Sequence, residues 1–213
     1  MAIYCSPFAL NVVNDSSSSL RKRKLSKYIG QSVRILPIRI LTVGKKRTAG
    51  VQLLVEDYIS KIQHYCPIHD LSIRSNPNNA RDARVQVNDE DAAMLNLMTA
   101  NDRVVVLDED GQDIGSVQMA ELIADAGNSV SGSSIELSFQ IGCVTDLNLI
   151  SQGASRLSFC IGGPYGHGEG MRRRSDRTIK LSSMVLNHEI ALIVLAEQIY
   201  RAWTILKGQN YHH

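Results

Sequence analysis

The chain has 213 residues, a mass of 23.5 kDa and a formal net charge of +2. This length allows one substantial domain, and a hydrophobic content of 44% fits a packed core. No apolar run approaches the roughly 18 residues of a membrane span, and the four cysteines show neither a CxxC pair nor a zinc-type spacing with histidine. We therefore expect no membrane contact, no disulfide framework and no metal site.

Residues 1–37 differ from the rest of the chain in charge. They carry six basic residues and one acidic residue, whereas the remainder carries 17 basic and 20 acidic residues. They also contain seven serines, four of them consecutive at Ser16–Ser19. A basic, serine-rich and acid-poor stretch is typical of an organellar transit peptide, and the serine run favours a chloroplast over a mitochondrion. The alternative is a disordered basic tail that contacts RNA directly.

Strand-like and helix-like patterns alternate from residue 38 onward, which predicts an α/β domain over residues 38–213 with a mainly parallel sheet. Short β-branched runs predict strands at 38–43, 68–73 and 104–107. Apolar residues at a period near 3.6 predict helices at 50–65, 87–99 and 117–126.

Several residues are expected to end or cap these elements. Asp108 to Gly111 would close the third strand, and Gly127 would cap the third helix at its C-terminus. In the second helix Asp89, Glu90 and Asp91 would lie in the first turn, where negative charge is favourable.

Two basic clusters can be interpreted either as solvent-exposed surface or as functional residues. The first, Lys45 to Arg47, follows the first predicted strand, and the second, Arg172 to Arg174, precedes Arg177 and Lys180. Each is either a solvated surface or a set of phosphate contacts for RNA.

Residues 128–155 lie between the third predicted helix and the next strand and contain a near-duplicate of that strand. Leu137-Ser-Phe-x-Ile-Gly142 is repeated twenty positions later as Leu157-Ser-Phe-x-Ile-Gly162. Only the second copy continues into Gly-Pro-Tyr-Gly, so we assign the functional strand to residues 157–161. The first copy would be an extra edge strand or a competitor that weakens the strand register.

The C-terminal part combines a glycine loop, an apolar loop and an apolar helix. The strand at 157–161 runs into Gly162 and Gly163, where a backbone without Cβ would let a ligand approach closely. A second apolar run at 181–186 precedes His188 and a helix at 189–206. Together these segments predict a pocket for a small ligand. The chain has no GxGxxG or GK[ST] sequence, which argues against a nicotinamide-dependent oxidoreductase and a P-loop enzyme.

Specific segments in this order resemble one known family. They are Arg39 to Lys45, Val104 to Asp108, Ile161-Gly-Gly-Pro-x-Gly166, Leu181-Ser-x-Met184, His188, Glu197-Gln-x-Tyr-Arg-Ala202 and Tyr211-His212. The chain thereby resembles, from about residue 38 to its end, the RlmH family of bacterial large-subunit ribosomal RNA pseudouridine N3-methyltransferases, which belongs to the SPOUT superfamily. The resemblance implies an α/β fold with a C-terminal trefoil knot, S-adenosylmethionine (SAM) as methyl donor, ribosomal RNA or the large ribosomal subunit as partner, and a homodimer.

The resemblance also implies a cofactor pocket made by three loops. The residues expected to hold SAM are Leu107, Gly162, Gly163, Leu181, Ser182, Ser183, Met184, Val185 and Leu186. In such a pocket apolar side chains bury the adenine ring, while backbone N–H and C=O groups recognise its edge.

The same comparison gives His188, Arg201, Tyr211 and His212 as catalytic candidates. Methyl transfer depends on an acceptor nitrogen held in line, and a general base helps because N3 of a uracil-type ring carries a proton. Either histidine could instead be structural, and Tyr211 could stack on an everted base. Arg201 would either pair with Glu197, four residues earlier, or reach a phosphate or the base.

Two positions depart from the family pattern, which commonly has proline at Asn187 and arginine at Leu192. The helix at 189–206 is apolar on most sides, which predicts a dimer interface besides a core contact. The leading interpretation is a SAM-dependent methyltransferase acting on organellar large-subunit ribosomal RNA. The alternative is an RNA- or ribosome-binding protein that retains the knotted fold with weak catalysis, because the insert and Leu192 could impair the site.

Overall fold

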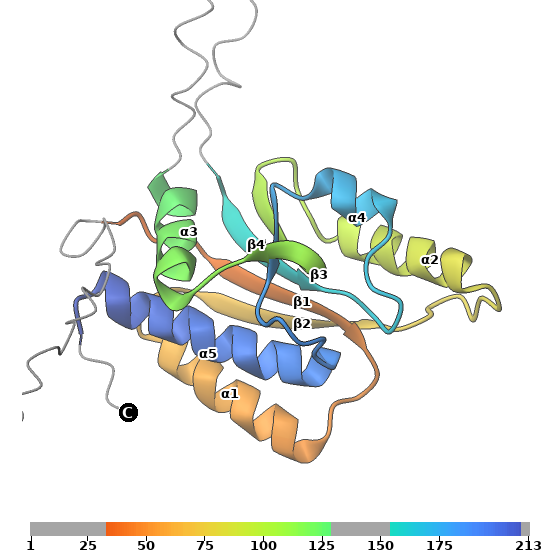
Figure 1. The fold of residues 1–213 in the computed structure, drawn as a ribbon, viewed down its shortest axis with the longest axis horizontal. Coiled ribbons are helices and arrows are strands. Elements are labelled where there is room, and N and C mark those ends of the chain that lie inside the picture. The colour runs from red at the N-terminus through yellow and green to blue at the C-terminus, as the bar shows by residue number, and fades with distance from the viewer. Residues whose placement is uncertain (1–32, 129–153, 210–213) are drawn as a thin grey trace, which may run out of the picture.

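The computed structural model describes residues 33–128 and 154–209, and these form a five-stranded sheet with helices on both faces (Figure 1). The strand order is β2-β1-β4-β3-β5, and every neighbouring pair is parallel. The strands are β1 (Ile38–Gly44), β2 (Ile68–Arg74), β3 (Asp102–Asp113), β4 (Arg156–Ile161) and β5 (Arg177–Lys180). The predicted α/β class with a parallel sheet is therefore confirmed, whereas the trefoil knot stays a prediction.

Three predicted features lie outside the described residues. They are residues 1–32 of the leader predicted at 1–37, most of the insert together with its strand copy at Leu137 to Gly142, and the terminal residues Tyr211 and His212. The domain boundary near residue 38 and the transit peptide accordingly remain predictions.

The helices divide between the two faces of the sheet (Figure 1). The bounds are α1 (Ala49–Gln63), α2 (Ala83–Leu95), α3 (Ser116–Asn128), α4 (Glu169–Arg174) and α5 (His188–Leu206). One core joins α1, α3 and α5 to the sheet, and a smaller one joins α2 and α4 to the opposite face. Successive strand residues alternate between them, since Ile40 and Phe159 belong to the first core and Leu41 and Cys160 to the second. Burial on both faces explains the near-continuous apolar strands.

Helix α5 is covered mainly within the single chain. It packs against α1 and α3, and Trp203 near its end stacks on Tyr65 with ring centroids 6.1 Å apart. Leu192, where the family pattern has arginine, has no exposed surface and is part of the core. Two helices of the same chain fill most of its apolar sides, so the core contact is confirmed, whereas the dimer interface on this helix stays a prediction.

Four element boundaries also differ from the sequence prediction. Helix α2 begins four residues early because Asp82 caps it, accepting a hydrogen bond from the backbone N–H of Arg84 at 2.7 Å. Strand β3 continues to Asp113 instead of closing at Asp108. Gly127 lies inside α3, where a Cβ would come within 2.1 Å of the carbonyl oxygen of Arg34. The second basic cluster forms the short helix α4 and leads into the unpredicted strand β5.

The amino ends of three strands are joined by one carboxylate. Asp102 in β3 has a fully buried side chain that accepts hydrogen bonds from Arg39 of β1 at 2.7 Å and from Arg156 of β4 at 3.0 Å. The hydroxyls of Thr99 and Ser155 also donate to it, each at 2.9 Å. Burial by itself would raise the pKa of Asp102, but these hydrogen bonds and that from the backbone of Thr99 hold its pKa below the ordinary value.

We expect Asp102→Asn to lower the free energy of unfolding by about 3–5 kcal/mol, because the buried guanidinium of Arg39 loses its counter-charge. Urea unfolding measures the change. Asp57→Asn is the control, because its partner Lys61 is exposed and such pairs contribute about 1 kcal/mol or less. Equal losses in the two variants would contradict a stabilising role for the Asp102 network.

A second expectation concerns pH. Because the pKa of Asp102 is lowered in the folded state, its ionised form stabilises the fold above the unfolded value, and this contribution is lost as the pH falls through the folded pKa. Urea midpoints measured below pH 4 should therefore decline more steeply for the wild type than for Asp102→Asn. Parallel slopes would contradict this assignment.

Candidate active site

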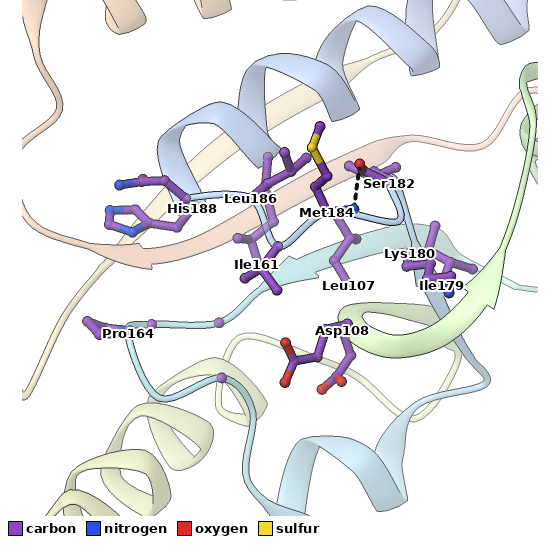
Figure 2. Close-up of a pocket in the computed structure, with 18 of the residues that line it drawn as sticks. Leu107, Asp108, Ile161, Pro164, Ile179, Lys180, Ser182, Met184, Leu186 and His188 are labelled. Carbon is purple, nitrogen blue, oxygen red and sulfur yellow. Dashed lines mark hydrogen bonds between the residues drawn. The ribbon is translucent and has the colours of Figure 1, made fainter.

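A cavity of about 670 Å³ lies at the carboxyl ends of β3, β4 and β5, beside the first turn of α5 (Figure 2). Its walls come from Leu107 at the end of the first β3 segment, Ile161 at the end of β4, the glycine loop that follows, and the loop at 181–187. In parallel α/β sheets ligands bind outside the carboxyl ends of the strands, and cavities of roughly 300–1,000 Å³ suit small molecules. The position and size of this cavity therefore fit a small-molecule site.

The structure brings together most of the residues that the sequence assigned to the cofactor. Eight of the nine line the cavity, and Ser183 does not. The eight are Leu107, Gly162, Gly163, Leu181, Ser182, Met184, Val185 and Leu186.

The four catalytic candidates are not brought together in the described part of the chain. His188 lines the cavity, and Tyr211 and His212 lie beyond residue 209, where the description ends. Arg201 is thirteen residues after His188 on the same helix, which places it about 20 Å further along the axis. Its Nε donates to Glu197 Oε1 at 3.0 Å, as the four-residue spacing predicted. Within this chain Arg201 therefore does not line the cavity.

The paired glycines allow close packing of the loop that they begin. A Cβ on Gly162 would lie 2.7 Å from the backbone of Gly166, and a Cβ on Gly163 would lie 2.6 Å from Oε2 of Glu90. Gly166 has a φ of +73° and donates its N–H to the carbonyl of Gly163 at 3.0 Å. The missing side chains thus let the loop fold onto itself and onto α2. Both glycines also line the cavity, and close approach of a ligand to their backbone stays a prediction.

Two buried carboxylates of α2 hold the surrounding loops. Asp91 accepts hydrogen bonds from the N–H groups of Gly168 at 3.1 Å and Met171 at 3.0 Å, at the start of α4. Glu90 Oε1 accepts from the hydroxyl of Ser75 at 2.9 Å and the N–H of Asn76 at 2.8 Å, in the loop after β2. The sequence placed both acids in the first turn of the helix, whereas they lie in its second half, so their role in holding the loops was missed.

A bulge in β3 directs two more carboxylates to the cavity. The register of β3 against β5 shifts between Leu107 and Gln112, and Asp108 and Glu109 within this bulge line the cavity. A Cβ on Gly111 would lie 2.4 Å from the backbone of Ile179, so only glycine allows this approach. Asp108 pairs with Arg172 at 2.8 Å and is 5% exposed. The acidic run directly after a predicted strand was the sequence signal for these residues.

The first turn of α5 explains one departure from the family pattern. The side chain of Asn187 accepts a hydrogen bond from the N–H of Glu189 at 2.9 Å and so caps the helix. Asparagine therefore replaces proline without loss of a helix start. His188 follows directly, and Figure 2 places it with Pro164 on the side of the cavity away from Lys180.

The cavity combines an apolar wall with charged groups at its rim. Besides the loop residues, Ile161 and Ile179 are apolar, and Asp108, Glu109, Arg172 and Lys180 carry charge. Within residues 33–128 and 154–209, no group of three or more His, Cys, Asp or Glu side chains could hold a metal ion. No helix in the same ranges is long and apolar enough to cross a membrane.

Comparison with known proteins agrees with this architecture. The family described as "Predicted SPOUT methyltransferase" matches residues 36–148 and 144–212. A protein of Arabidopsis thaliana named "Putative RNA methyltransferase" is 55% identical over 198 residues, which cover 93% of this chain and 91% of that protein. The "Ribosomal RNA large subunit methyltransferase H" of Christiangramia forsetii is 31% identical over 183 residues, covering 84% of this chain and 99% of that protein.

A solved structure, the SpoU methyltransferase AviRb of Streptomyces viridochromogenes in complex with AdoMet, is 11% identical. It aligns with a TM-score of 0.35 over 82% of this chain and 60% of that chain. The family match and the sequence relatives confirm the resemblance to RlmH. The chain therefore belongs to the SPOUT methyltransferase family, whose methyl donor is S-adenosylmethionine.

Proposed function

We propose that this RNA methyltransferase of RlmH type transfers a methyl group from SAM to N3 of a pseudouridine in the large-subunit ribosomal RNA of an organelle. The observation that carries the proposal is the 670 Å³ cavity, because the three loops expected to hold SAM converge on it. The relatives named as large-subunit ribosomal RNA methyltransferases support the choice of RNA. The serine-rich basic leader supports an organelle, a chloroplast rather than a mitochondrion.

The residues of the cavity fit SAM in size and chemistry. Leu181, Met184 and Leu186 offer apolar surface for an adenine ring, and the backbone of their loop offers hydrogen-bonding groups for its edge. The carboxylates of Asp108 and Glu109 would attract the positive charges of the sulfonium and amino groups. When bound, SAM supplies an electrophilic methyl group.

His188 is the residue of this chain best placed to act on the acceptor. It lines the cavity at the start of a helix that is anchored in the core, so its position is fixed relative to the loops. An imidazole there would accept the proton that leaves N3 of the uracil-type ring. Tyr211 and His212 remain candidates for the same step or for stacking on the base.

We also propose that the protein acts as a homodimer, on grounds other than the burial of α5. Large apolar side chains at the cavity and the adjacent turn of α5 are exposed, namely Tyr165 at 60%, Met184 at 73%, Val185 at 79% and Ile190 at 47%. Clustered exposed apolar groups are typical of protein interfaces. Arg201 lies outside the cavity of its own chain. A second copy that covers these side chains would give Arg201 a way to act, at the cavity of the other subunit.

We expect the wild-type protein to bind SAM in calorimetry and Gly162→Ala to bind at least about tenfold more weakly, or about 1.4 kcal/mol. The added Cβ forces the backbone of Gly166 to move and so displaces a wall of the cavity. Gly50→Ala is the matched control, because a Cβ there meets no atom within 4 Å. A wild-type protein that fails to bind SAM would favour the catalytically weak RNA-binding alternative.

The reaction itself is tested by mapping methylated pseudouridine in organellar ribosomal RNA from cells that lack the protein. We expect one N3-methyl mark to disappear and the wild-type gene to restore it. His188→Gln should restore it poorly, with a turnover reduced about 10²- to 10⁴-fold, the usual contribution of a general base. His64→Gln changes an exposed histidine at the end of α1 and serves as the control. An unchanged modification pattern in the deleted cells would reject the ribosomal assignment.

A further inference from the structure

A second cavity of about 610 Å³ lies at the carboxyl ends of β1 and β2. It adjoins the first cavity, because Gly44 lines the second cavity and a Cβ on Gly44 would lie 3.3 Å from Nε2 of His188. His188 itself lines the first cavity. The proposed methyl-transfer site and this groove are therefore neighbours at Gly44 and His188.

The groove is lined by three cations, Lys45, Lys46 and Arg74, and all three residues are exposed. Within the described ranges none of the three has an ion-pair partner. Arg47 differs, because both of its terminal nitrogens bond to Asp70, with Nη2 to Oδ1 at 2.8 Å. That pair fastens the loop after β1, so the two lysines before it are presented from an anchored segment.

The floor of the groove is fixed by hydrogen bonds. The N–H of Ser75 donates to the carbonyl of Gly44 at 3.2 Å, which ties the ends of β1 and β2 together. Asn76 and Asn79 adopt left-handed conformations with φ of 48° and 55°, and Glu90 Oε1 accepts hydrogen bonds from Ser75 and Asn76. The lining thus combines three positive charges with polar side chains, which suits an anion, while Glu90 beneath it holds the loop in place.

We propose that this groove binds backbone phosphates of the RNA substrate next to the nucleotide whose base enters the first cavity beside His188. The inference rests on the proposed function and adds the path of the RNA. Phosphate contacts position a nucleic acid and are made by lysine, arginine and polar side chains of this kind. The position of the groove beside His188 fits this role, because an RNA chain that passes over Gly44 would run from one cavity to the other.

The test compares two double variants with the same loss of charge. Lys45→Ala/Lys46→Ala changes the groove. The control Lys61→Ala/Lys207→Ala changes lysines at the C-terminal ends of α1 and α5, which lie toward the amino ends of the strands, away from the groove (Figure 1). Fluorescence anisotropy of a labelled single-stranded oligouridine is measured over a range of KCl concentrations. Arg74→Ala is measured in the same way.

Each phosphate contact on a single strand contributes about 0.7 to the slope of log affinity against log salt concentration. We expect the slope to flatten by about 1.4 in Lys45→Ala/Lys46→Ala and by about 0.7 in Arg74→Ala, with the control variant equal to the wild type. SAM binding should be unchanged in all three, since none of these residues lines the first cavity.

Three results would overturn the inference. If the control variant flattens the slope as much as the groove variant, the effect is one of general charge. A groove variant that binds and methylates RNA like wild type rejects the groove alone. A wild-type protein that binds SAM but no RNA rejects the proposed function as well.

Discussion

The placement of both cavities depends on two adjacent carboxylates in the middle of α2. Successive residues of an α-helix point about 100° apart, so Glu90 and Asp91 reach different loops from the same turn. Asp91 binds two backbone N–H groups at the start of α4, and Glu90 binds the loop after β2. Buried carboxylates need such partners, because without them their burial is costly. A single rigid helical turn therefore fixes the glycine loop of the first cavity relative to the floor of the second.

The amino ends and the carboxyl ends of the parallel strands differ in function. At the amino edge Asp102 ties β1, β3 and β4 together through Arg39 and Arg156, and no cavity described above lies there. At the carboxyl ends of the strands the glycines pack closely, but exposed apolar side chains such as Met184 and Val185 contribute little to the packing of the chain. The ion pairs of Asp102 at the amino ends can offset the weaker packing at the carboxyl ends, because the free energy of unfolding is a property of the whole cooperative domain.

The sequence was sufficient for those parts of the fold that depend on local pattern. The strands at β1, β2 and β4 were predicted within a residue or so, because a buried parallel strand is a short β-branched run between breaks. The loop at 181–186 and the glycine loop were also placed correctly beside one cavity. These successes rest on chain-local signals and on a family resemblance that covers the same segments.

The parts that were missed depend on partners far away in the sequence. The bulge at Asp108 exists because Gly111 lies against Ile179, 68 residues later, and nothing local distinguishes it from a strand end. The burial of Glu90 and Asp91 depends on the loops at Ser75 and Gly168. Such contacts become visible only when the strand order is known.

The covering of α5 within one chain changes what a second subunit would contribute. Since α1 and α3 fill most of its apolar sides, a partner is not needed to complete the core. The apolar side chains left exposed are instead at the mouth of the first cavity, on Tyr165, Met184 and Val185, and on the next turn at Ile190. A partner bound there would remove water from the proposed methyl-transfer site and strengthen the electrostatic interactions within it. Dimer formation and closure of the active site would then be one event, which gives a physical reason for an enzyme of this size to act as a pair.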